Sequence, residues 1–166
     1  MFFTQHMFLM PPALDDDTRR WVPHLTLILS SYRHWTGRDF IEAHPANEAL
    51  AQWIFKAPFA LLSHGREPDP LFNYANQSAL EVFGMKMEEM MAWPSRFSAE
   101  ACHRDERARL LSEVAEKGYS EGYQGIRQGR RGRFEIIGAK VWNLVDAEGI
   151  YQGQAASFSS WHWLKD

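Results

Sequence analysis

The pattern of apolar and polar residues changes along the chain and divides it into helical and extended stretches. Between Pro23 and Gly37, apolar residues recur at three- and four-residue spacing, which predicts an amphipathic helix. A second helix with one apolar face is expected between Pro45 and Pro58. The apolar faces of both helices must be buried, either against the sheet of the same domain or against a second subunit.

A compact unit of strand, turn, strand and helix is expected from Ala57 to Met85. Two short apolar runs are separated by a loop that contains two prolines. Either Asn76 or Ser78 is expected to cap the helix that follows, which Gly84 ends. The two strands of this unit are expected to join the later strands in one sheet.

The C-terminal part follows a charged helix, expected over about Arg104–Lys117, and has a period of two. Strands are expected over about Tyr119–Gln128, Arg133–Leu144 and Ile150–Trp161, joined by short turns as an antiparallel meander. In the middle strand, alternation should separate two faces of the sheet: Phe134, Ile136, Trp142 and Leu144 against Ile137, Ala139 and Val141. The whole order predicts an α+β domain with helices packed on an antiparallel sheet.

We divide the chain into three parts: an N-terminal arm with two amphipathic helices (1–57), a core (58–161) and a C-terminal tail (162–166). A chain of 166 residues can bury a core without disulfide or metal. The arm contains Phe2, Phe3, Phe8 and Leu9, so it is expected to pack on this domain or on a partner subunit, with disorder as the alternative.

Composition and charge narrow the function classes. The net charge of −3 indicates no general affinity for nucleic acid, and no apolar run is long enough to span a membrane. The single cysteine, Cys102, suits a reducing compartment, so a cytoplasmic location is expected. Aromatic residues make up 14% of the chain, which fits a packed core, a dimer interface or the surroundings of a planar ligand.

The chain lacks the sequence patterns of common catalytic sites. It contains no nucleophile elbow, no phosphate-binding glycine loop and no histidine pair at metal-ligand spacing. An enzyme is therefore not expected. The basic cluster RQGRRGR, with Arg127, Arg130, Arg131 and Arg133, is interpreted as a solvated hairpin turn, or alternatively as a site for an anionic partner.

Two sets of residues resemble known families. Asn76, Ala79, Phe83 and Gly84 stand as in the PAS pattern N-x-x-A-x-x-x-F-G. Nearly the whole chain resembles the MEKHLA family, a PAS-related group with stand-alone bacterial members, in the blocks SHGREPDPLFNYANQSALEVF, WPSRFSAE, RARLL, YQGIR and VWNLVDAEGIYQGQAASF. The resemblance implies a PAS-like five-stranded antiparallel sheet with helices packed on one face and an N-terminal helical extension.

The flavin-binding LOV branch of PAS domains carries the signature N-C-R-F-L-Q, whose cysteine forms a photo-adduct. The equivalent segment here runs from Pro94 to Ala99, and Ser95 takes the place of the cysteine. A hydroxyl of ordinary pKa is a poor replacement for a thiol, so adduct chemistry is not expected. Arg96 and Arg109 could clamp a phosphate, or could instead form surface ion pairs with nearby carboxylates.

The resemblance implies a non-catalytic sensory or ligand-binding domain that acts in signalling or regulation. It would bind a small planar molecule or a protein partner, and would form a homodimer through the N-terminal extension or the sheet. A structural dimerisation module with a filled core is the alternative, and a flavin- or haem-dependent enzyme is a third. A non-covalent flavin is the first candidate cofactor, followed by haem or none. The expected ligand-binding residues are Phe72, Asn76, Phe83, Trp93, Ser95, Arg96, Arg109, Tyr123, Trp142 and Asn143.

Overall fold

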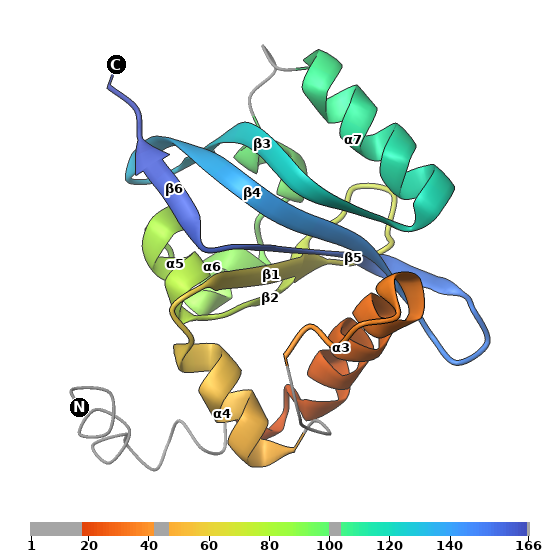
Figure 1. Ribbon diagram of the computed structural model, residues 1–166. Helices are drawn as coiled ribbons and strands as arrows, with labels where there is room; N and C mark the ends of the chain where they lie inside the picture. Colours follow the sequence, from red (N-terminus) through yellow and green to blue (C-terminus); the bar gives the residue numbers. More distant parts are fainter. Residues whose placement is uncertain (1–17, 42–46, 100–103, 166) are drawn as a thin grey trace.

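The computed structural model describes residues 18–41, 47–99 and 104–165, and its centre is one antiparallel sheet (Figure 1). The strands lie in the order β2-β1-β5-β4-β3, and a sixth strand, β6, pairs with β4. Their bounds are β1 Ala60–His64, β2 Phe72–Ala75, β3 Tyr119–Gly129, β4 Gly132–Val145, β5 Tyr151–Phe158 and β6 Ser160–Trp163. The predicted α+β architecture, with the first strand pair and the C-terminal meander in one sheet, is confirmed.

The sheet has one strand more than expected. The segment predicted as a single last strand is broken by a bend at Ser159, which separates β5 from β6. Beyond the bend, β6 pairs antiparallel with the first half of β4, from Phe134 opposite Trp163 to Ile137 opposite Ser160. The end of β6 therefore lies within the segment expected as the tail, while the proposed boundaries at 57, 58 and 161 stay predictions.

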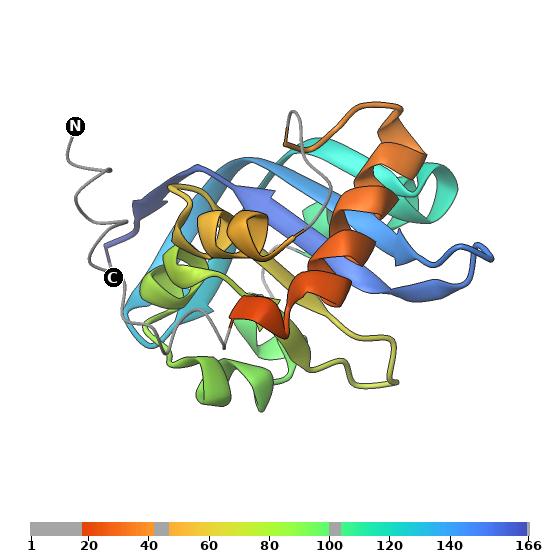
Figure 2. The same ribbon diagram turned by 90° about the horizontal axis from the view of Figure 1, so that it is seen from below.

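Helices cover both faces of the sheet: the core helices pack on one face, as expected, and the N-terminal extension packs on the other, which is one of the two places that the sequence left open for it. The helices are α3 Val22–Thr36, α4 Glu48–Lys56, α5 Gln77–Phe83, α6 Met87–Met91 and α7 Arg104–Lys117, with a short 3₁₀ turn, η1, at Ser95–Ser98. One apolar cluster joins α5, α6 and α7 to one face. A second joins α3 and α4 to the opposite face, where Figures 1 and 2 show α3 running across the sheet.

Helix α3 is tied to the end of β4 by hydrogen bonds as well as by apolar contact. The indole N–H of Trp142 donates to the carbonyl oxygen of Ile28 at 3.0 Å, and the indole N–H of Trp35 donates to the carbonyl oxygen of Asn143 at 2.9 Å. The Ser31 hydroxyl also bonds both backbone groups of Val145. The apolar stripe of this helix is thus buried on the sheet of its own chain.

A β-bulge explains why the predicted faces of β4 are wrong. Phe134 and Ile136 belong to one apolar cluster, whereas Trp142 and Leu144 belong to the cluster on the opposite face. Between them, Gly138 adopts a left-handed backbone with φ of 69°, and the β3–β4 register shifts there. An extra residue in one strand reverses the direction of every later side chain. The simple alternation read from the sequence cannot hold across it.

The cap of α5 is confirmed and has a second role. The Asn76 side-chain oxygen accepts from the N–H groups of Ala79 and Leu61, and its amide nitrogen donates to the carbonyls of Ile54 and Phe59. One fully buried side chain thereby joins α4, β1 and α5. Gly84, with φ of 68°, ends α5 as predicted.

Several sequence expectations concern residues outside the described ranges. The arm (1–17), Pro45 and Cys102 are among these residues. Within the described ranges, no helix has the length and apolar character that crossing a membrane requires.

Candidate functional site

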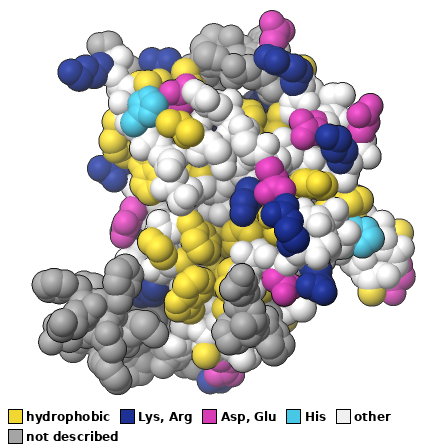
Figure 3. All heavy atoms as spheres, viewed as in Figure 1, with side chains coloured by type: hydrophobic (Ala, Val, Ile, Leu, Met, Phe, Trp, Pro, Cys, Tyr) yellow, Lys and Arg dark blue, Asp and Glu magenta, His cyan; other side chains and the backbone are white. Residues whose placement is uncertain are grey.

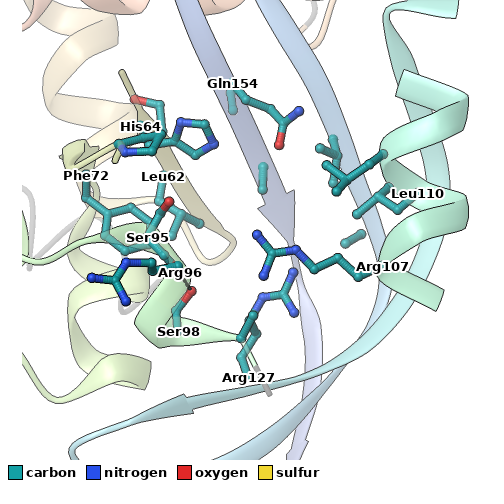
Figure 4. Close-up of a pocket in the computed structure, with 18 of the residues that line it drawn as sticks. Leu62, His64, Phe72, Ser95, Arg96, Ser98, Arg107, Leu110, Arg127 and Gln154 are labelled. Carbon is teal, nitrogen blue, oxygen red and sulfur yellow. Dashed lines mark hydrogen bonds between the residues drawn. The ribbon is translucent and has the colours of Figure 1, made fainter. Parts of the chain in front are cut away.

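A cavity of about 400 Å³ lies between the sheet, helix α7 and the 3₁₀ turn η1 (Figure 4). Strands β1, β3, β4 and β5 form its floor, while α7, η1 and the β1–β2 loop form its walls and rim. This volume is within the range of small-molecule sites in proteins. The sheet therefore offers a preformed concave surface on the face opposite α3.

The interior of the cavity is apolar. It is lined by Leu62, Phe72, Phe83, Leu110, Ile136, Ala139, Val141, Ala156 and Phe158. The small residues Ala139 and Ala156 lie on neighbouring strands and leave space above the sheet, which larger side chains would fill. An organic ring or chain would be desolvated here without leaving polar protein groups unpaired.

One end of the cavity presents hydrogen-bond acceptors. The Nδ1 of His64 donates to the carbonyl oxygen of Gly65 at 2.8 Å, so the neutral ring keeps a lone pair on Nε2. The amide nitrogen of Gln154 donates to Asn143 Oδ1 at 3.3 Å. This bond leaves the Gln154 carbonyl oxygen pointing into the cavity, near the His64 ring (Figure 4).

Tyr151 adds a donor to the same rim. Partial burial raises the pKa of the Tyr151 phenol above its ordinary value, so the hydroxyl keeps its proton at neutral pH. The nearby β1–β2 loop is shaped by Glu67, whose carboxylate accepts from the Leu71 N–H at 2.6 Å. That bond lowers the pKa of Glu67, which therefore stays ionised.

The other end is cationic. Arg107 from α7, Arg127 from β3 and Arg96 from η1 all line the cavity. Arg96 already pairs with Asp69, at 2.9 Å, and lies over the Phe97 ring. Figure 4 shows the guanidinium groups of Arg107 and Arg127 pointing into the space between α7 and β3. An anion could bind at this end, while the apolar part of a ligand would lie on the sheet.

Five of the ten residues expected to bind a ligand line this cavity: Phe72, Phe83, Ser95, Arg96 and Tyr123. They come from β2, α5, η1 and β3, so the fold brings together side chains that are distant in sequence. Their contact with a ligand stays a prediction. The other five, Asn76, Trp93, Arg109, Trp142 and Asn143, do not line it.

Each of these five residues has a physical reason to lie elsewhere. Asn76 is fully buried among backbone groups, and Trp142 faces α3 because of the bulge at Gly138. Trp93 packs behind the wall, 5.9 Å from the Phe72 ring centre. Arg109 is exposed on α7. Asn143 lies behind Gln154, and its amide nitrogen donates to the Val114 carbonyl at 3.4 Å.

Sequence reasoning missed His64, Arg107, Arg127 and Gln154 as cavity residues. Two of them had a usable signal. Arg127 is four residues from Tyr123 on the same strand and therefore on the same face. Arg107 precedes Leu110 by three residues, which places both on one side of α7. His64 and Gln154 meet only through the pairing of β1 with β5, where they are direct partners.

The arrangement of the sheet is that of PAS and LOV domains. An RNA-binding light-oxygen-voltage receptor matches with a TM-score of 0.57 at 17% identity, over 66% of this chain and 31% of that one. A LOV domain studied with a flavin analogue matches with a TM-score of 0.51 at 17% identity, over 66% and 82%. A PAS domain from Colwellia psychrerythraea matches with a TM-score of 0.54 at 11% identity, over 66% and 92%. At these identities the likeness concerns the fold alone.

The chain belongs to the MEKHLA domain family, whose model matches residues 22–163. The match includes α3, so the N-terminal helix is part of the family's pattern and not an unrelated addition. The chain spans about a third of the RNA-binding receptor it resembles. No curated protein matches the sequence.

Proposed function

We propose that this chain is a non-catalytic sensory domain that binds a small planar molecule in the cavity above its sheet. One observation carries the proposal: an apolar cavity of about 400 Å³ has hydrogen-bonding groups at one end and cations at the other. A core whose only role was structural would gain stability by filling this space with larger side chains. We place the action of the domain in the cytoplasm, in a signalling or regulatory protein.

A non-covalently held flavin is one molecule that suits these walls. Phe72 and Phe83 offer ring contacts, and Arg107 and Arg127 could hold a phosphate. Ser95 lines the cavity, but its hydroxyl lacks the nucleophilicity that a covalent adduct requires. We therefore infer that any flavin would be bound reversibly and would not form a cysteine-type adduct.

Filling the cavity tests the proposal directly. Ala156 lines the cavity and is only partly buried, so Ala156→Phe would project a ring into the space. Ala147→Phe, in the exposed β4–β5 turn, is the matched control. The readouts are the absorbance spectrum, native mass spectrometry and binding of the neutral fluorescent probe N-phenyl-1-naphthylamine.

We expect the wild type and Ala147→Phe to bind the probe, and Ala156→Phe to lose it while remaining folded. A wild type that carries no extra mass and binds no probe would refute ligand binding. That result would favour the alternative, a dimerisation module without ligand.

Exposed apolar side chains support dimerisation, which is part of both the ligand-binding proposal and this alternative. Trp53, Ile137, Ile150 and Trp163 are each at least 40% exposed. In Figure 3, apolar side chains gather where α4 leads into β1. The exposed Trp53 belongs to α4. Homodimer formation through this region or through the sheet is part of our proposal, and light scattering of Trp53→Ser against wild type tests it.

A further inference from the structure

Arg107 and Arg127 present two positive charges to the same end of the cavity. One comes from α7 and the other from β3, two elements that pack side by side along the edge of the sheet (Figure 1). Both guanidinium groups point into the space between these elements (Figure 4). Like charges that converge on one space repel each other unless an anion lies between them.

Several other arginines in the described residues already have carboxylate partners. Arg33, Arg38, Arg96 and Arg130 each form an ion pair with a described carboxylate: Asp39, Glu121, Asp69 and Glu89 respectively. Arg107 and Arg127 form no ion pair with any carboxylate in the described ranges. Their charges therefore stay available to a bound molecule.

The side chain of Arg127 is held in place by residues of its own strand, β3. Its guanidinium lies 5.3 Å from the centre of the Tyr123 ring, and its Nη1 donates to the Ile126 carbonyl at 3.2 Å. Gly125 lies between the two residues on the same face of β3, and a Cβ there would overlap the Tyr123 hydroxyl. The absent side chain lets the tyrosine ring lie along the strand. A cation in a fixed position loses less entropy when it binds an anion.

The apolar floor and the opposite end of the cavity restrict the chemistry of the rest of the ligand. An apolar surface leads from the arginines towards His64 Nε2 and the Gln154 carbonyl, which both accept hydrogen bonds. A purely inorganic anion would use only one end of this space.

We propose that the ligand is an amphipathic organic oxyanion. Its carboxylate or phosphate group binds Arg107 and Arg127, its flat apolar body lies on the sheet, and a donor group reaches His64 and Gln154. This assignment rests on the proposed function, because it names the ligand class of the same cavity.

Two related probes test the assignment. The sulfonate 8-anilinonaphthalene-1-sulfonate carries an oxyanion, and N-phenyl-1-naphthylamine has the same rings without it. Affinities are measured for wild type, Arg107→Gln, Arg127→Gln and the control Arg109→Gln, which removes an exposed charge two residues from Arg107 on α7. Circular dichroism and thermal unfolding establish that each variant is folded.

We expect each cavity variant to bind the sulfonate about tenfold more weakly, since a charge-assisted hydrogen bond is lost, and to bind the neutral probe unchanged. Arg109→Gln should match wild type with both probes. Arg127→Lys should retain part of the sulfonate affinity, because the charge remains while the forked geometry is lost.

The outcomes separate the two proposals. If the neutral probe binds the cavity but the sulfonate affinity is the same in all four proteins, the oxyanion assignment is wrong and the ligand-binding function stands. If Ala156→Phe changes the affinity for neither probe, the probes do not bind in this cavity and the proposed ligand-binding function is wrong. Competition by 1-naphthoic acid and 1-naphthyl phosphate then distinguishes a carboxylate from a phosphate ligand by which one displaces the sulfonate at lower concentration.

Discussion

The indole N–H of Trp142 donates a 3.0 Å hydrogen bond to the backbone carbonyl of Ile28 and joins the sheet to the N-terminal helix. Both residues are fully buried. The Ile28 carbonyl therefore has no access to solvent, and the ring of Tyr32 packs edge-on against the indole at 5.0 Å. The interface between α3 and the sheet has the character of a domain core.

Trp142→Phe should destabilise the fold by about 2 kcal/mol, because it removes a buried hydrogen bond to the Ile28 carbonyl and part of a packed ring. Urea unfolding followed by circular dichroism measures this change. Trp53→Phe is the control, since the Trp53 side chain is 42% exposed, and its effect should stay within about 0.5 kcal/mol. Equal effects of the two substitutions would contradict the role assigned to the α3 interface.

Removing the N-terminal helices tests whether residues 58–161 form a separate unit. A fragment that begins at Pro58 would expose Leu61, Tyr74, Trp142 and Leu144, all on the face that α3 and α4 cover. We expect this fragment to aggregate or to lose its cooperative unfolding transition. A fragment that begins at Thr18 keeps this face covered and should unfold cooperatively. Cooperative unfolding of the shorter fragment would show that the helices are an accessory.

The sequence predicted most elements of this fold, because most have a local signal, whereas the division of the last strand into β5 and β6 was missed. The helix after Asn76 has a capping residue, a periodic apolar stripe and a final glycine, and all three features are present in the structure. The meander has alternation and short turns. The site was harder to predict because it depends on which residues of different elements face one another.

The bulge at Gly138 illustrates this limit. A glycine within a strand pattern indicates either a weak point or a bulge, and only the partner strand distinguishes them. Here β3 also changes register at Gly122, so the two strands compensate each other. The pairing of His64 with Gln154 is likewise a property of strand order. Neither fact has a counterpart in the local spacing of residues.

Substitution of Asn76 should be among the most destabilising single changes in the chain. Asn76→Ala removes the cap of α5 and leaves the Leu61 N–H and two carbonyls without their buried partner. The expected loss is about 3–4 kcal/mol, measured by urea unfolding. Asn76→Asp keeps the acceptor but cannot donate to the two carbonyls, so it should not restore stability at neutral pH.

The control for Asn76 is the other asparagine cap. Asn47 is exposed, and its side-chain oxygen accepts from the Leu50 N–H at 2.9 Å. Asn47→Ala should therefore cost about 1 kcal/mol. If Asn76→Ala were no more destabilising than Asn47→Ala, the hydrogen bonds by which Asn76 joins α4, β1 and α5 would add no stability beyond that of a helix cap.

His24 should make the stability of the α3 interface depend on pH. Its Nε2 lies 2.8 Å from the Ser63 hydroxyl, which in turn donates to Asn73 Oδ1 at 2.5 Å. Burial is the main cause that lowers the pKa of His24 below its ordinary value of 6.5. The folded chain therefore keeps this ring neutral at a pH where the unfolded chain protonates it.

The direction in which the free energy of unfolding changes with pH depends on whether the folded or the unfolded chain binds more protons. Below about pH 6.5 the unfolded chain gains a proton that the folded chain takes up only at lower pH, so the free energy of unfolding falls as the pH falls through this window. The slope for one group cannot exceed about 1.4 kcal/mol per pH unit. His24→Gln should flatten the wild-type profile between pH 7 and pH 5. Urea unfolding at a series of pH values measures both profiles, and identical slopes for His24→Gln and wild type would assign the acid sensitivity to another group.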